Sequence, residues 1–244
     1  MSEPVVHFEL LRVETIVATP AELARVFADR LTIAARLAQK NGRALSLVLP
    51  GGSVAEIFLP VIAEAAVDWA QVNVFWGDER AVGPDHPESN YRLADALLLS
   101  RVAIDRARVH RMPADGPELD AGASAYEAEL VRVLGKPPRF DVVLLGVGPD
   151  GHVCSLFPGH QALEETSRRV VAVTDAPKPP PRRLTLTLAA LEGAEIYIAA
   201  FGAAKAEVVR SALLTPASPL PVARAARAGA RTAFLLDRDA AGLL

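Results

Sequence analysis

The chain of 244 residues has little cysteine, few aromatic residues and no long hydrophobic run, and each shortage excludes a class of protein. Its single cysteine, Cys154, excludes an internal disulfide and a metal cluster held by cysteines alone. No apolar run reaches the roughly 18 residues of a membrane helix, so we expect no membrane partner. The opening residues, Met1–Pro4, lack a basic stretch followed by an apolar one, so we expect no leader and a cytoplasmic location.

An excess of charge of one sign is also missing. With 26 Lys and Arg against 29 Asp and Glu, the net charge is −3, and no basic surface is expected to bind nucleic acid. An anionic ligand would therefore need a local cluster of donors. Hydrophobic residues make up 51% and aromatic residues 5% of the chain, a composition typical of Ala, Leu and Val helices packed on a parallel sheet.

Apolar runs of strand length alternate with helical patterns along the chain. A capping box at Thr19–Glu22, with proline at the first helical position, predicts a helix to about residue 40. A second box, Ser53–Glu56, predicts a helix to about residue 66. Another helix is expected to begin at Ser124–Glu127. Further helices are expected over 89–99 and 203–213, and strands over 44–49, 72–76, 140–145, 169–174, 196–200 and 232–236.

This alternation predicts an α/β fold with a mostly parallel, doubly wound open sheet and helices on both faces, similar to a Rossmann fold. With no internal repeat and no clear boundary, we expect residues 1–244 to form a single domain. Ligands of such sheets bind at the carboxyl ends of the strands, which directs attention to the loops that follow the predicted strands.

Two of these loops follow the first two apolar strands. In Pro50–Ser53, two glycines allow close approach of a ligand, and the next helix presents free N–H groups. The loop is either a phosphate cradle or an ordinary turn with Ser53 as the N-cap. In Gly77–Arg80, two acids and an arginine follow a strand, and they form either a solvated loop or a site, because burying them requires partners.

The third loop, Gly146–Cys154, contains a G-x-G-x-x-G string that raises a dinucleotide-binding alternative. Pro149 lacks an amide donor and Asp150 would repel a pyrophosphate, although Asp175 follows the next predicted strand, where a ribose-binding acid could lie. His152 is better interpreted as a base oriented by Asp150, with a purely structural histidine as the other possibility.

Two more loops carry basic residues. Prolines stiffen the segment 177–185, where Lys178 and Arg183 offer donors to an anion, unless the segment is only a surface loop. Lys205 lies in the first turn of a predicted helix, where a positive charge is unfavourable. A bound anion would remove this conflict, which favours a binding role for Lys205.

In their order and their residues, these five segments resemble the 6-phosphogluconolactonase family over nearly the whole chain. Gly77–Arg80 and the run from Asp150–His152 to Ser155–Gly159 are the most specific. The resemblance implies hydrolysis of 6-phospho-D-glucono-1,5-lactone in the oxidative pentose phosphate pathway, with no cofactor and no metal ion. The chain departs from the family at Val54-Ala55, where a hydroxyl residue and proline are common, and so lacks one possible phosphate donor.

The resemblance also implies roles for single residues. His152 would be the general base for a water that attacks C1, and Asp78 would orient groups at the reacting end. Backbone amides of the 148–151 loop, or Arg80, would stabilise the oxyanion. The phosphate would be held by Gly52, Ser53, Arg183 and Lys205. The expected substrate-binding residues are Gly51, Gly52, Ser53, Arg80, Asp150, Gly151, Arg183 and Lys205.

Two other functions share the expected fold. An amino-sugar phosphate deaminase usually continues its histidine loop into an acidic segment with asparagine, whereas this chain continues as Ser155–Gly159. A sugar-phosphate sensor carries a DNA-binding module, for which we expect no spare residues. We therefore expect a small sugar-phosphate lactone as the partner, and a monomer or a small homo-oligomer as the assembly.

Overall fold

The computed structural model describes residues 13–244, so Met1–Pro4 lie outside the described residues. The main sheet has six strands, all parallel, in the order β1-β9-β8-β5-β2-β3. Their bounds are β1 (Val13–Val17), β2 (Leu45–Leu49), β3 (Val72–Trp76), β5 (Val142–Gly146), β8 (Glu195–Ala200) and β9 (Arg231–Leu236). The predicted α/β fold with a mostly parallel sheet is confirmed.

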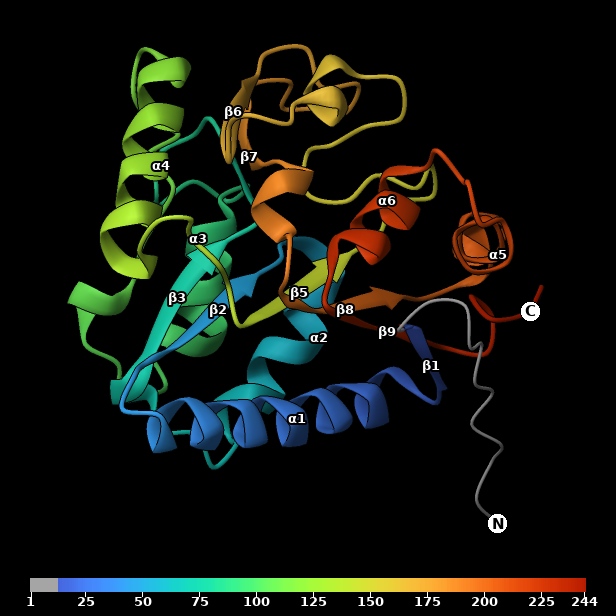
Figure 1. Ribbon diagram of the computed structural model, residues 1–244, viewed down its shortest axis with the longest axis horizontal. Helices are drawn as coiled ribbons and strands as arrows, with labels where there is room; N and C mark the ends of the chain where they lie inside the picture. Colours follow the sequence, from blue (N-terminus) through green and yellow to red (C-terminus); the bar gives the residue numbers. More distant parts are fainter. Residues whose placement is uncertain (1–12) are drawn as a thin grey trace.

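A second, antiparallel sheet of three strands lies above the main sheet in the view of Figure 1. Its order is β4 (Asp78–Arg80), β7 (Arg183–Leu186) and β6 (Val170–Val173). The sequence predicted β6 as a strand but not its place in a separate sheet. The sequence pattern predicts loops at both β4 and β7, because β4 is three charged residues long and β7 follows a run of prolines. Both segments are strands in the structure.

Helices cover both faces of the main sheet, as predicted. Figure 1 shows α1 (Pro20–Lys40) and α2 (Gly52–Ala63) below the sheet and α6 (Pro221–Ala228) above it. The other helices are α3 (Asn90–Ala94), which continues as a π-turn over Asp95–Leu99, α4 (Leu119–Leu134) and α5 (Ala206–Leu214). Short 3₁₀ turns lie at Trp69–Gln71, Arg106–Arg108, Gln161–Glu164, Leu188–Leu191 and Ala203–Lys205.

Only one of the two predicted capping boxes forms. Thr19 caps α1: its Oγ1 accepts a hydrogen bond from the Glu22 amide (3.4 Å), and the Glu22 carboxylate accepts one from the Thr19 amide (3.0 Å). The box at Ser53 is wrong, since α2 begins at Gly52 with Gly51 as its N-cap and no side-chain cap. The predicted helix start at Ser124 is also wrong, because this residue lies inside α4 and its Oγ donates to a carbonyl of the preceding turn.

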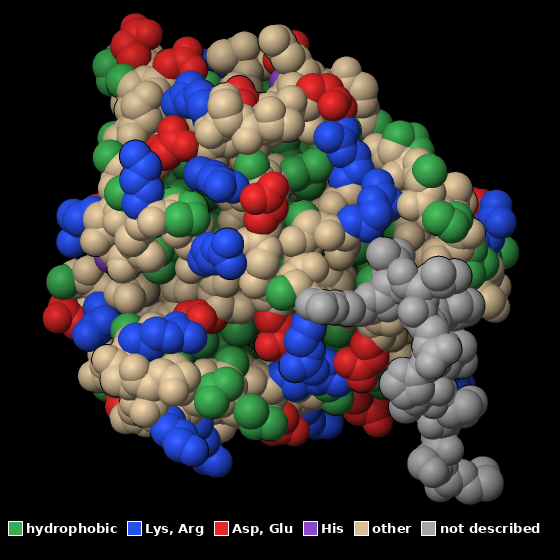
Figure 2. Space-filling view, viewed as in Figure 1, with side chains coloured by type: hydrophobic (Ala, Val, Ile, Leu, Met, Phe, Trp, Pro, Cys, Tyr) green, Lys and Arg blue, Asp and Glu red, His purple; other side chains and the backbone are tan. Residues whose placement is uncertain are grey.

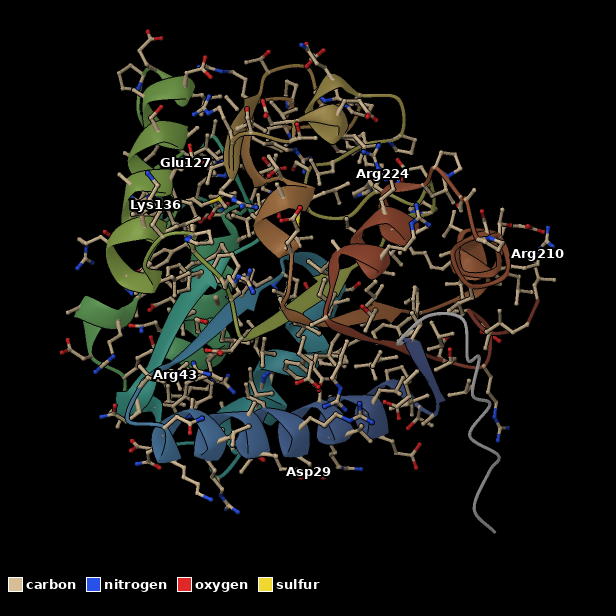
Figure 3. The ribbon with its side chains drawn as sticks, in the orientation of Figure 1. Asp29, Arg43, Glu127, Lys136, Arg210 and Arg224 are labelled. Carbon is tan, nitrogen blue, oxygen red and sulfur yellow. The ribbon has the colours of Figure 1, made fainter. Side chains whose placement is uncertain are left out.

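Charged side chains away from the carboxyl ends of the strands connect neighbouring elements. Arg43 and Asp141 pair at 2.7 Å at the amino-terminal ends of β2 and β5, and Arg224 of α6 pairs with Glu164 at 2.5 Å. Figure 3 labels Arg43 and Arg224. On the face shown in Figure 2, basic and acidic side chains are interspersed rather than grouped by sign. Within residues 13–244, no helix has both the length and the apolar character of a membrane span.

Candidate active site

A cavity of about 260 Å³ opens at the carboxyl ends of β8, β5, β2 and β3. The chain leaves β2 for β3 at the edge and returns to β5 on the other side of β2. The cavity therefore lies at the topological switch point, where ligands bind in open α/β sheets. Eight of the predicted site residues line it, namely Gly51, Gly52, Ser53, Asp78, Arg80, His152, Arg183 and Lys205. Asp150 and Gly151 do not line it.

His152 lies in the cavity wall with its ring oriented by Asp150. Its Nδ1 is 2.5 Å from Oδ1 of Asp150, which leaves Nε2 as the nitrogen available to a ligand. Burial lowers the pKa of His152 below its usual 6.5, and Asp150 opposes this shift. A Cβ at Gly148 would lie 2.0 Å from Nδ1, so only glycine allows the ring to pack here. The site thus holds a neutral imidazole beside a carboxylate at neutral pH.

Asp78 lies in the same cavity, with its carboxylate fixed by neighbours from three other segments. Its Oδ2 accepts a hydrogen bond from Ser155 (2.6 Å) and lies 3.7 Å from Nη1 of Arg183. Its Oδ1 accepts a hydrogen bond from the side-chain amide (Nδ2) of Asn90 (3.1 Å). These partners compensate for the burial of the charge, and they hold the carboxylate in one orientation.

The alternation of side chains along β4 gives its two acids different roles. Asp78 and Arg80 line the cavity, whereas Glu79 is buried at the start of α3. Burial raises the pKa of Glu79, while the amides of Tyr91 and Asn90, each 2.8 Å away, act against the shift. Glu79 thereby fixes the backbone of Asn90, whose side chain reaches back to Asp78.

The other wall of the cavity can hold an anion. α2 begins there without a side-chain cap, so the N–H groups of Gly52 and Ser53 belong to an open helix N-terminus. Lys205 lines the same cavity and Lys178 does as well. Burial lowers the pKa of Lys205, and the charge of Lys178 lowers it further, while Asp150 opposes both. Two ammonium groups and a helix N-terminus therefore converge on one space.

The glycines of the histidine turn differ from their predicted role. The amide of Gly148 donates to the carbonyl of His152, and the amide of Gly151 donates to that of Gly148, both at 2.9 Å. These two amides donate within the turn, so the amide of Asp150 and the side chain of Arg80 remain as predicted donors to an oxyanion. Gly151 has a φ of +84° and packs against Leu220, so it shapes the turn rather than the cavity wall.

The dinucleotide alternative is wrong for this geometry. A Rossmann phosphate loop leads directly into a helix and is followed by a parallel neighbouring strand. Here the loop after β5 closes on itself through a bridge between Val153 and Leu156. The strand before Asp175 is β6, which belongs to the antiparallel sheet, and Asp175 pairs with His160 at 2.9 Å.

Three residues that the structure places at the site were not among the expected catalytic or substrate-binding residues. Asn90 and Lys178 line the cavity, and Ser155 holds Asp78. All three lie in or next to the strand-end segments described in the sequence analysis. The signal that could have found Asn90 is its position at the start of a predicted helix, which brings a polar side chain to a strand end.

The fold and the cavity define an α/β enzyme with a histidine–carboxylate pair beside an anion-binding wall. Residues 18–234 match the family described as glucosamine-6-phosphate isomerases/6-phosphogluconolactonase, and the chain belongs to this family. The 6-phosphogluconolactonase of Mycobacterium tuberculosis is 44% identical over 214 residues, which are 84% of this chain and 86% of that protein. That of Streptomyces coelicolor is 41% identical over 236 residues, 91% of this chain and 90% of that one.

Solved structures of 6-phosphogluconolactonases have the same fold as this chain. The 6-phosphogluconolactonase of Trypanosoma brucei matches with a TM-score of 0.82 and 31% identity, covering 94% of this chain and 98% of that one. A monomeric glucosamine-6-phosphate deaminase matches with a TM-score of 0.79 at 22% identity, over 95% of this chain and 99% of that one, which shows a shared fold alone.

Proposed function

We propose that this protein hydrolyses 6-phospho-D-glucono-1,5-lactone to 6-phosphogluconate, a step of the oxidative pentose phosphate pathway. Relatives at 41–44% identity, covering more than four fifths of the chain, carry the name of that activity. The observation that carries the proposal is one cavity with the His152–Asp150 pair and Asp78 together with Lys205 and an open helix N-terminus.

The reaction needs a base at the lactone carbonyl. Nε2 of His152 takes a proton from a water as its oxygen attacks C1, and Asp150 stabilises the imidazolium that forms. Arg80 donates to the oxyanion, which collapses with cleavage of the bond between C1 and the ring oxygen. The leaving ring oxygen takes the proton from His152, which returns the base to its neutral form and gives the open-chain acid.

The remaining groups bind the substrate. The phosphate lies against the N–H groups of Gly52 and Ser53 and the ammonium of Lys205, where the helix dipole favours a negative charge. Asp78 accepts a hydrogen bond from a substrate hydroxyl or from the attacking water. Its fixed carboxylate costs no further ordering on binding, because Ser155 and Asn90 already hold it.

An assay panel on the purified protein tests the proposal. Freshly prepared lactone and glucosamine 6-phosphate are supplied separately, and acid production and ammonia release are measured against the spontaneous rates. We expect acid production above background and no ammonia. Ammonia release without lactone hydrolysis would establish a deaminase instead, and binding of both compounds without turnover would indicate a sensor. We further propose that the protein acts in the cytoplasm, which fractionation of cells tests.

A further inference from the structure

The guanidinium of Arg183 is engaged by its own chain rather than free for a ligand. Its Nη2 donates to the carbonyls of Lys178 (3.0 Å) and Pro179 (3.2 Å), and its Nε donates to that of Pro180 (2.9 Å). Its Nη1 faces Ser155 at 3.4 Å. The side chain is only 6% exposed, so these contacts occupy most of its donors.

The loop that Arg183 holds has few other means of support. Pro179, Pro180 and Pro181 have no N–H group, so this stretch cannot donate backbone hydrogen bonds. The carbonyl of Pro181 accepts one bond, from the amide of Ala176 at 3.0 Å. The three carbonyls before it are those that Arg183 binds, so the path of the loop depends on this one side chain.

Lys178, at the start of this loop, carries its ammonium to the catalytic pair. Its Nζ is 3.5 Å from Oδ1 of Asp150 and 3.4 Å from Nδ1 of His152. Its side chain is 40% exposed. The position of the ammonium is therefore set by the backbone from which it extends.

We propose that Arg183 is a positioning residue, which holds the 178–180 backbone so that the ammonium of Lys178 stays beside the His152–Asp150 pair. In this role Arg183 does not bind the substrate phosphate, whereas the sequence predicted that it would. The proposal rests on the proposed lactone hydrolysis only in taking His152 as the base. It assigns the phosphate to the α2 N-terminus and Lys205.

Several charged groups around His152 shift its pKa, and Lys178 is one of them. Asp150 on the same turn and Asp78 on β4 favour the imidazolium, whereas Lys178 disfavours it and adds to the effect of burial. Lys205 faces Lys178 and Asp150 from the turn before α5. A fixed Lys178 thus keeps Asp150 ionised and His152 neutral, so that the base is ready at lower pH than it would otherwise be.

Two variants test this role. Arg183→Lys keeps the positive charge but loses the planar fork that binds three carbonyls, and Lys178→Met removes the ammonium itself. The pKa of His152 is measured by NMR titration, with the resonance assigned from a His152→Gln sample, and the affinity for inorganic phosphate is measured by calorimetry. Arg182→Lys is the matched control, because Arg182 is the next residue in the chain, is exposed and does not line the cavity.

We expect the pKa of His152 to rise in both variants, by about 0.7 for a unit charge withdrawn from about 4 Å in a water-like medium. The double variant should show no further rise, because both changes remove the same contact. Phosphate affinity should fall no more in Arg183→Lys than in Lys178→Met, and Arg182→Lys should match the wild type in both measurements.

An unchanged pKa in Arg183→Lys would overturn the proposal, as would a rise that adds to that of Lys178→Met. A larger loss of phosphate affinity in Arg183→Lys than in Lys178→Met would make Arg183 a phosphate ligand. If circular dichroism shows that Arg183→Lys is unfolded, the same criteria apply to Arg183→Gln. Neither readout needs turnover, so failure of this inference is distinct from failure of the lactone assay.

Discussion

The side chain of His152 contacts an acid on its own turn and lies partly out of water, and these two features act on its pKa in opposite directions. Burial has the larger effect, so the ring is neutral at neutral pH and becomes protonated only below about pH 6.5. A protonated ring cannot accept a proton from water. We therefore expect the catalysed rate to be constant above the pKa of His152 and to fall as the pH drops through it.

His152→Gln should fold normally and lose roughly 10²–10⁴-fold in kcat, with little change in KM, because the phosphate is held elsewhere. Measurement of kcat together with Tm separates a catalytic role from a structural one. His86→Gln is a suitable control, since His86 is exposed and lies outside the cavity wall. A folded His152→Gln variant that hydrolyses the lactone at nearly the wild-type rate would end this account of the mechanism.

Lys205 should affect binding more than chemistry. A charge-assisted hydrogen bond contributes about 1.5–3 kcal/mol, so Lys205→Met should raise KM by about one to two orders of magnitude. Steady-state kinetics checks this, with Lys40→Met on the exposed end of α1 as the control. An unchanged KM with a collapsed kcat would place Lys205 at the reacting end instead.

Most of the charged or titratable residues of the cavity wall could be predicted from the sequence, because loops after neighbouring parallel strands meet at one edge. His152, Asp78 and Lys205 each follow a strand in this way. The contacts of Arg183 could not be predicted, since they depend on the path of a proline loop that bends back on it. Fixed neighbours are a property of tertiary structure that residue types alone do not determine.

At the scale of elements, five strands of the main sheet were predicted, whereas β1 and the short strands β4 and β7 were not. A strand of three charged residues has no apolar alternation and forms only because its partner supplies the hydrogen bonds. This pairing matters for the site, since it places Asp78 opposite Thr185 and Arg80 opposite Arg183. The smaller sheet thereby brings charged side chains to the open ends of the larger one.

The two helices α1 and α2 begin differently, and the difference predicts unequal effects of similar substitutions on stability. Thr19→Ala removes the only side-chain cap of α1 and should cost about 1 kcal/mol in the free energy of unfolding, with no change in kcat. Ser53→Ala removes no cap and should leave stability within about 0.5 kcal/mol. Urea unfolding of both variants checks this, and an equal loss in the two would contradict the observed helix starts.

At the scale of the whole molecule, the proposed reaction uses side chains that gain and lose protons and requires no metal ion. Within residues 13–244, no group of three or more histidine, cysteine or carboxylate side chains could hold a metal ion. We expect lactone hydrolysis to survive dialysis against EDTA, measured as an initial rate before and after treatment. Loss of the rate, restored by one particular ion, would contradict this prediction.

Stability of the whole fold should depend on pH through a histidine that does not line the cavity. His110 is buried, stacks on Phe75 at 4.6 Å, and places Nδ1 2.7 Å from Glu129. Burial lowers its pKa below 6.5, while Glu129 opposes the shift. The unfolded chain therefore binds a proton more readily than the folded one, so the stability from this residue is complete above pH 6.5 and is lost as the pH falls.

Urea unfolding of the wild type and of His110→Gln at pH 7.0 and pH 5.5 measures this contribution. The carboxylates with lowered pKa values, Glu129 among them at about 2, respond mainly below their unfolded value of 4.5 and so add little in this window. We expect the wild type to lose more stability than the variant between the two pH values, even if the variant is less stable at both. Some dependence should remain in the variant, because burial also lowers the pKa of His152. An equal loss in both proteins would show that His110 takes up a proton as readily in the folded chain as in the unfolded one, and that Glu129 offsets its burial completely.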